Sequence, residues 1–158
     1  MIGGIVKSKI PYDNLFSVPE CNWILGGPPD RTYATLRIYQ VDLDPDELTR
    51  LFSVTPSGFQ VTGKPFTKRP KYVAKIGGWF LTTKDRCKSL DYSDHVEWIL
   101  NQVGHCRNSI LELQSKGYEM EVAVKVDFGN CNPTPGLSAA VIKRLAAFNL
   151  SCWFDVYV

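Results

Sequence analysis

Three stretches of the chain alternate apolar and polar residues with a period of two, which is typical of half-buried β-strands. They are residues 33–41 (YATLRIYQV), 118–128 (YEMEVAVKVDF) and 150–158 (LSCWFDVYV). The apolar residues that we expect the last stretch to bury are Leu150, Cys152, Phe154, Val156 and Val158. Because each stretch has one apolar and one polar side, the pattern predicts a sheet covered on one face only, and such sheets are antiparallel or mixed.

A spacing of three and four residues between apolar positions predicts a long amphipathic helix before the second of these strands. The apolar positions run from Val96 to Leu113, and Asp91 or Ser93 can cap the N-terminus. Gly117 suits the position just after the C-terminus. We expect one continuous helix of about 23 residues, roughly 34 Å long.

Two shorter helices are predicted by their caps. In "DPDELTRLF", Asp44 can cap the first turn and Glu47 completes a capping box. In "LSAAVIKRLAAFN", Ser138 is the expected cap and Asn149 the expected left-handed residue at the end.

The region between the first short helix and the long helix has a weaker pattern. The pattern predicts a weak strand or a loop for residues 54–71 and an extended segment for residues 72–83. Within that segment Gly77 and Gly78 directly precede Trp79, although glycine weakens a strand. We interpret the pair as a bulge or bend that turns Trp79 under a neighbouring element. A ligand that approaches the glycine backbone is the alternative, but no phosphate-loop motif is present.

The predicted order of elements is therefore β-α-(β)-β-α-β-α-β. This order, with helices on one face of a mainly antiparallel sheet, predicts an α+β fold built as a two-layer sandwich. Residues 1–31 are rich in proline and lack periodicity, so we expect an irregular N-terminal extension there. Residues 32–158 are expected to form a single α+β domain.

The composition of the chain narrows the class of protein. It has 158 residues, of which 44% are hydrophobic and 22% charged, as in a soluble globular domain. No apolar run approaches the roughly 18 to 20 residues that cross a bilayer, and we expect no signal peptide. Five widely spaced cysteines without a CxxC motif are typical of a reduced protein, so we expect a cytoplasmic location.

Aromatic and charged residues are enriched on the polar sides of the three alternating strands. Tyr, Trp and Arg are the residues that anchor protein–protein contacts. The residues on these strands that we expect to bind a partner are Tyr33, Arg37, Tyr39, Lys125, Trp153, Asp155 and Tyr157. Two alternatives stay open: cross-strand pairs that merely stabilise a solvated sheet by about 0.2–1 kcal/mol each, and a cover formed by the N-terminal extension.

A basic stretch lies at residues 63–75 (GKPFTKRPKYVAK), where lysine and arginine interleave with Phe66 and Tyr72. We include Lys68 and Arg69 among the expected binding residues. The stretch suits an acidic protein partner, or a nucleic acid whose bases stack on the aromatic rings. It can equally be a solvated loop without a partner.

The sequence offers little catalytic or metal chemistry. His95 and His105 are ten residues apart on the predicted long helix, which separates them by about 15 Å. That is too far for one metal ion, and no local nucleophile motif is present. We therefore predict no catalytic residue, cofactor or metal, although an enzyme or small-ligand binder with a pocket near Trp79 remains an alternative.

Four motifs in order resemble a bacterial family known as domain of unknown function 4279. They are "YATLRIYQVDLDPDELTRLF", "GGWFLTTKD", "DHVEWIL" and "LAAFNLSCWFDVYV", and the resemblance covers about residues 32–158. It implies a small cytosolic bacterial α+β domain. It implies no activity, and so no catalytic residues.

These observations favour a non-enzymatic protein-binding module of a bacterial cytosol. An immunity protein, which neutralises a toxin by binding it directly, has this size and this kind of surface. A nucleic-acid-associated protein that uses the basic stretch is the alternative of a different class.

Overall fold

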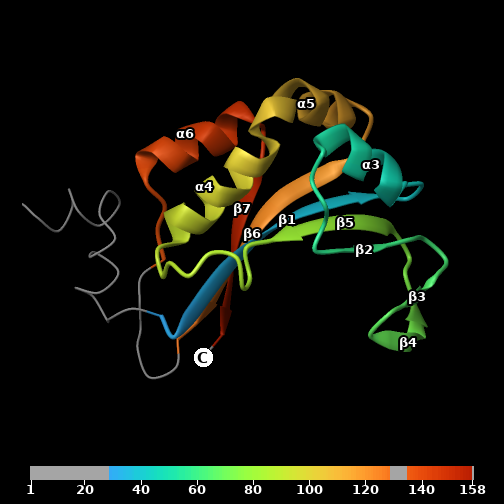
Figure 1. Cartoon of the computed structure of the whole chain (residues 1–158), viewed down its shortest axis with the longest axis horizontal. Coiled ribbons are helices and arrows are strands. Elements are labelled where there is room, and N and C mark those ends of the chain that lie inside the picture. The colour runs from blue at the N-terminus through green and yellow to red at the C-terminus, as the bar shows by residue number, and fades with distance from the viewer. Residues whose placement is uncertain (1–28, 129–134, 158) are drawn as a thin grey trace, which may run out of the picture.

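The protein is a two-layer α+β sandwich in which the helices cover one face of a sheet (Figure 1). The computed structural model describes residues 29–128 and 135–157, so most of the predicted N-terminal extension lies outside the described residues. The strands of the main sheet are β1 (Arg31–Gln40), β2 (Gly58–Gln60), β5 (Gly77–Thr82), β6 (Glu119–Asp127) and β7 (Ser151–Tyr157). A separate hairpin consists of β3 (Pro65–Phe66) and β4 (Arg69–Val73).

The helical layer contains α3 (Pro45–Phe52), α4 (Tyr92–Val103), a short 3₁₀ turn η1 (Gly104–Cys106), α5 (Arg107–Ser115) and α6 (Ala139–Ala147). The strand order in the main sheet is β2-β5-β1-β6-β7. β1 pairs antiparallel with β5 and β6, whereas β6 and β7 are parallel. The predicted α+β sandwich with helices on one face is thus confirmed.

The core lies between the sheet and the helices, and the alternation of β1 and β6 places their apolar residues in it. Leu36 and Val122, which are paired across these strands, are both fully or almost fully buried. The prediction for the last strand is wrong in part, because Val156 is 45% exposed and Phe154 is only half-buried, while Val158 lies outside the described residues. Among the described residues β7 has a neighbouring strand on one side only, so its inward side chains lie at the border of the sheet and are less covered.

The predicted single long helix is wrong, because the chain breaks into α4, η1 and α5. The break falls at Gly104, after Val103 leaves helical geometry with φ −106° and ψ 4°. Glycine is a poor helix former, so the break costs little there. It redirects α5, which buries Ile110, and lets the Gln114 amide donate to the Phe148 carbonyl at the end of α6, at 3.2 Å.

The helix ends follow the sequence. The Asp44 carboxylate accepts hydrogen bonds from the backbone at the start of α3, and the Ser138 hydroxyl accepts one from Val141 at the start of α6. Asn149 has φ 51° and Gly117 has φ +86°, so both end their helices in the left-handed region as predicted.

The region predicted as a weak strand or loop, residues 54–71, contains more structure than expected. β2 joins the edge of the sheet, and the chain then leaves the sheet to form the β3–β4 hairpin. The predicted extended segment 72–83 is also divided, because residues 72–73 end β4 and β5 begins only at Gly77. Every residue of β4 is exposed, so no apolar alternation marks this strand in the sequence.

Gly77 provides room for another part of the backbone. It lies opposite Gln40, where β1 turns toward α3. A Cβ atom at Gly77 would be 2.7 Å from the Gln40 carbonyl oxygen and 2.8 Å from Leu43 Cβ. That carbonyl oxygen accepts a hydrogen bond from the Leu43 N–H, so it is held in place by the turn.

Gly78 provides room for an aromatic ring on the opposite face. A Cβ atom there would be 2.6 Å from Phe80 Cζ, because the Phe80 ring folds back over Gly78. The ring then packs edge-on against Tyr39, with the ring centroids 5.6 Å apart. The predicted bulge is wrong, since the register between β1 and β5 runs without interruption.

Trp79 does lie under a neighbouring element, as the sequence predicted, and that element is α3. The Trp79 ring packs edge-on against Phe52 at 5.3 Å and is fully buried. Its indole N–H donates to the Thr49 hydroxyl at 3.1 Å. The two glycines therefore serve close packing within the protein's own chain.

We predict that Gly77→Ala destabilises the fold more than Gly78→Ala. The Gly77 methyl group would meet fixed backbone, at a cost of about 2–3 kcal/mol, whereas the Phe80 ring can move away from a methyl group at Gly78. Urea unfolding followed by circular dichroism measures both. Gly58→Ala is the control, because no atom lies within 4 Å of a Cβ there, and we expect a change of no more than about 0.5 kcal/mol. Equal losses for Gly77→Ala and Gly58→Ala would contradict this explanation.

Candidate functional site

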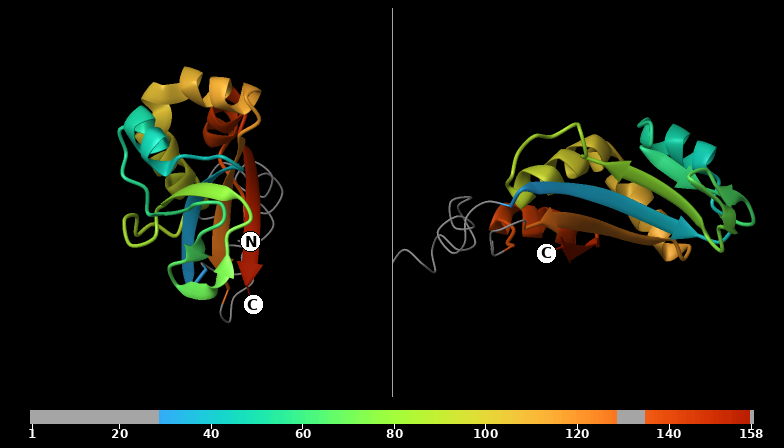
Figure 2. Two further views of the ribbon diagram at one scale, coloured as in Figure 1. Left: turned by 90° about the vertical axis from the view of Figure 1, so that its right-hand side faces the viewer. Right: turned by 90° about the horizontal axis from the view of Figure 1, so that it is seen from below.

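The side of the main sheet opposite the helices, which we call the outer face, gathers most of the predicted binding residues. Seen from below, the strands of this face lie in front of the helices (Figure 2). The residues that the register of β1, β6 and β7 places on it are Tyr33, Arg37, Tyr39, Lys125, Trp153, Asp155 and Tyr157. In the described part of the chain no helix or strand of the fold covers this face.

Arg37 links three strands at the centre of the outer face. It lies opposite Glu121 on β6, with 3.5 Å between guanidinium and carboxylate, and it reaches Asp155 on β7 at 2.9 Å. All three side chains are partly exposed, so each pair contributes little to stability by itself. The network mainly fixes the positions of its members and leaves none of these charges without an opposite charge nearby.

A second cluster lies at the end of the face where β1 begins. Arg31 donates to Asp127 at 2.6 Å, and Lys125 lies 3.5 Å from the same carboxylate. Burial by itself would raise the pKa of Asp127. The hydrogen bond from Arg31 and the charge of Lys125 outweigh burial and hold this pKa below its usual value. The Lys125 ammonium also lies over the Tyr157 ring, 4.0 Å from its centroid.

The aromatic residues of the outer face differ in exposure. Trp153 is 58% exposed and Tyr157 is 53% exposed, both on β7. Tyr33 and Tyr39 on β1 are less exposed than these two, and Tyr39 packs against Phe80. Phe80 was not predicted as part of this face. In a regular strand neighbouring side chains point to opposite faces, so Phe80 must lie on the outer face once Trp79 is known to point to the core.

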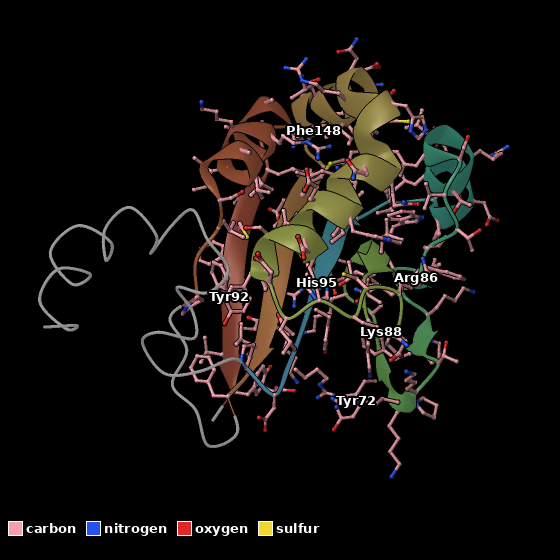
Figure 3. The ribbon with its side chains drawn as sticks, turned by 60° about the vertical axis from the view of Figure 1, so that its left-hand side comes forward. Tyr72, Arg86, Lys88, Tyr92, His95 and Phe148 are labelled. Carbon is pink, nitrogen blue, oxygen red and sulfur yellow. The ribbon has the colours of Figure 1, made fainter. Side chains whose placement is uncertain are left out.

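Lys68 and Arg69 are not part of the outer face, because they belong to the β3–β4 hairpin. This hairpin extends past the sheet on the side away from the helices (Figure 1). Its basic residues are Lys64, Lys68, Arg69, Lys71 and Lys75, and the stretch contains no acidic residue. None of them forms an ion pair with any other described residue. Tyr72, on the same hairpin, is 64% exposed (Figure 3).

His95 is a structural residue of the core. It is fully buried on α4, beside the loop that carries Arg86 and Lys88 (Figure 3). Its Nε2–H donates to the Ser89 carbonyl at 2.7 Å, and its Nδ1 accepts from the Thr83 hydroxyl at 2.6 Å. Both nitrogens are used, and burial lowers the pKa of His95, so the neutral ring joins α4 to the loop before it.

Tyr92 is the other buried polar residue of interest on α4. Its ring packs edge-on against Phe154 of β7 at 5.9 Å, and it is fully buried. Its hydroxyl has no hydrogen-bond partner among the residues that the structure describes. Burial raises the pKa of Tyr92 to about 12, so it carries no charge near neutral pH.

Hollows in the surface formed by described residues include the following two. One, of about 450 Å³, lies between residues 30–33 and 84–90. The other, of about 350 Å³, lies beside the start of α3 and Phe59. The Trp79 side chain lines neither of them. Over the same residues no group of His, Cys, Asp or Glu side chains is placed to hold a metal ion, and no helix is long and apolar enough to cross a membrane.

We predict that His95 makes the fold weaker in acid. Because burial lowers the pKa of the folded form, the unfolded chain takes up the proton first as pH falls. Stability should be complete above about pH 6.5 and decline below it, by at most about 1.4 kcal/mol per pH unit. Urea unfolding between pH 5 and 8 measures this slope.

The control for this prediction is the exposed histidine. His95→Gln should flatten the decline in stability between pH 6.5 and 5, whereas His105→Gln should leave it unchanged, because His105 is exposed. Identical slopes for the wild-type protein and His95→Gln would show that another group causes the acid sensitivity.

Comparison with known proteins adds one finding. The family model described as "Domain of unknown function (DUF4279)" matches residues 30–158, which is well over half of the chain. No curated protein and no solved structure matches the chain. The match begins just before β1 and includes every helix and strand described above. The chain therefore belongs to the DUF4279 family.

Proposed function

We propose that the protein is a non-enzymatic protein-binding module that docks a partner on the outer face of its sheet. The observation that carries this proposal is the pair of exposed aromatic residues on β7, Trp153 and Tyr157. Around them the charged residues are already paired with one another, so a partner gains apolar contact without leaving charges unpaired. Exposed Trp and Tyr in such a setting are typical centres of protein interfaces.

The β3–β4 hairpin gives this interface a basic rim. Its five cationic residues have no ion-pair partner among the described residues, and it extends past the outer face. A partner with an acidic border beside an apolar contact fits this arrangement. A nucleic acid fits less well, because its phosphates would meet Glu119, Glu121 and Asp127 on the outer face.

The finer proposal is an immunity protein of a bacterial cytosol, which binds a toxin and blocks it. The size of the domain and its one-sided aromatic face support this class. The free thiols of Cys87, Cys106 and Cys152 accord with a reducing compartment. No catalytic role is proposed for any described residue, since His95 and Trp79 are both buried in structural contacts.

A nucleic-acid-associated protein is the second candidate. It would use Tyr72 and the cations of the hairpin, which together offer an aromatic ring and an unpaired basic surface. A small-ligand binder would use a surface hollow instead, such as the one between residues 30–33 and 84–90.

We predict that Trp153→Ala weakens binding of the partner by more than about 2 kcal/mol, because it removes the largest exposed aromatic contact. The partner is obtained by affinity capture from the lysate of the native host and then purified for calorimetry. Phe59→Ala is the matched control, since Phe59 is 59% exposed but lies off the outer face, and it should bind normally. Normal binding by a well-folded Trp153→Ala variant would rule out this face.

We also predict that the double variant Lys68→Glu/Arg69→Glu binds the partner about tenfold more weakly at low salt, with a smaller salt dependence. The control pair is Lys88→Glu/Lys143→Glu, two exposed lysines away from the hairpin. Salt-dependent binding of single-stranded DNA or RNA that the hairpin variant loses, with no captured protein, would favour the second candidate.

A further inference from the structure

Within residues 29–128 and 135–157, β7 forms a long edge of the main sheet that no other strand covers. It pairs with β6 over its whole length, and no described strand pairs with its other side. Proteins usually protect such edges with proline, lysine, bulges or very short strands. β7 has seven residues in continuous register, without proline or lysine. Its only charged residue, Asp155, is held by Arg37. The opposite edge is different, because β2 has only three residues.

The helical layer also has an exposed border above β7, formed by α6. On one flank of α6, Arg144 donates to Glu97 and Asn101 of α4. Ile142 is two residues before Arg144, which at about 100° per residue places it about 160° around the helix, on the flank away from α4. Since α4 packs on β1 and β6, and α6 packs on β7, that flank faces the free edge. Ile142 is 52% exposed, and Ala146 follows one turn later.

Both layers of the sandwich thus end in apolar side chains at one border. In the sheet, Val156 is 45% exposed, and Cys152 and Phe154 are half-buried although they point toward the core. In the helical layer, Ile142 is exposed beside them. An interface that resembles a domain core cut in half is characteristic of proteins that associate stably with a copy of themselves.

We propose that this border, β7 with the adjoining flank of α6, is the interface with a second copy of this chain. The two β7 strands pair antiparallel about a two-fold axis, so the two main sheets become continuous. The two α6 helices then pack side by side, with Ile142 and Ala146 between them. A single added strand from another protein would cover the β7 edge but not α6. A second copy brings a strand and a helix at matching heights, and so covers both layers.

The sequence of β7 suits antiparallel pairing with itself. With the two-fold axis at Phe154, Asp155 lies opposite Trp153 of the second copy, and Val156 lies opposite Cys152 of the second copy. Directly opposite residues share a face of the sheet, and these pairs satisfy that rule. An axis at Asp155 would instead place two carboxylates opposite each other. The register at Phe154 places an apolar residue on the axis and keeps the two Asp155 carboxylates from lying directly opposite each other.

This inference does not rest on the proposed function. Strand pairing uses the backbone edge of β7, so Trp153 and Tyr157 stay on the outer face of each copy. Binding of the partner and self-association can therefore succeed or fail separately.

Sedimentation equilibrium of the full chain tests the proposal. We expect the mass of two chains at tens of micromolar. Val156→Lys and Ile142→Glu should each weaken self-association at least tenfold and leave the circular dichroism spectrum unchanged. Val41→Lys is the matched control, since Val41 is 52% exposed but lies at the far end of β1, and it should associate normally.

A cross-linking experiment tests the register. In Val156→Cys the new thiol should lie opposite Cys152 of the second copy, so mild oxidation should give a two-chain product that Cys152→Ser abolishes. Two residues four apart in one strand cannot form this bond within a chain. The oxidised wild-type protein serves as the baseline for the other cysteines.

Two results would overturn the proposal. One is a single-chain mass at several hundred micromolar, and hydrogen exchange along β7 would then show whether another part of the chain protects the edge. The other is a two-chain mass that neither Val156→Lys nor Ile142→Glu reduces, which would place the interface elsewhere.

Discussion

β1 is the strand on which the main sheet depends, because it lies at the centre of the strand order, with β5 and β2 on one side and β6 and β7 on the other. Its inward residues Ala34, Leu36 and Ile38 are completely or almost completely buried. Its outward residue Arg37 holds β6 and β7 together through Glu121 and Asp155. The same ten residues thus support the core on one side and arrange the candidate binding face on the other. The turn after β1 also explains Gly77, whose missing side chain leaves room for Gln40 and Leu43.

Much of this fold was predictable because local patterns determine it. The alternation in β1 and β6 assigns each side chain to a face, and the caps at Asp44 and Ser138 set where helices begin. What the sequence could not show was which strands are neighbours. Burial of Val156 was predicted from alternation alone, and it failed because β7 lies at a border of the sheet. The hairpin was missed because its strands are exposed and carry no apolar period.

In the candidate site, too, some features follow from local patterns and others depend on which strands are neighbours. Tyr33, Arg37 and Trp153 share the outer face, as period-two alternation requires. The pairing of Arg37 with Asp155 could not be predicted in this way. It depends on β1 and β7, which are distant in sequence, both being neighbours of β6. Lys68 and Arg69 were predicted to bind because they belong to a basic stretch, and the structure places that stretch on a separate hairpin. Their relation to the face is set by where the chain leaves the sheet after β2.

The pairing of β1 with β6 has a consequence for how the protein is made. Arg31 and Asp127, which close this pair, are 96 residues apart in the chain. During synthesis at about 5–20 residues per second, β1 must therefore wait roughly 5–20 seconds for the strand that completes its second side. For that time the apolar residues of β1 lack the packing that β6 later provides, which is the situation in which chaperones act on a nascent chain. A domain whose central strand precedes its neighbour β6 by this distance can fold as a whole only after β6 and β7 have been made.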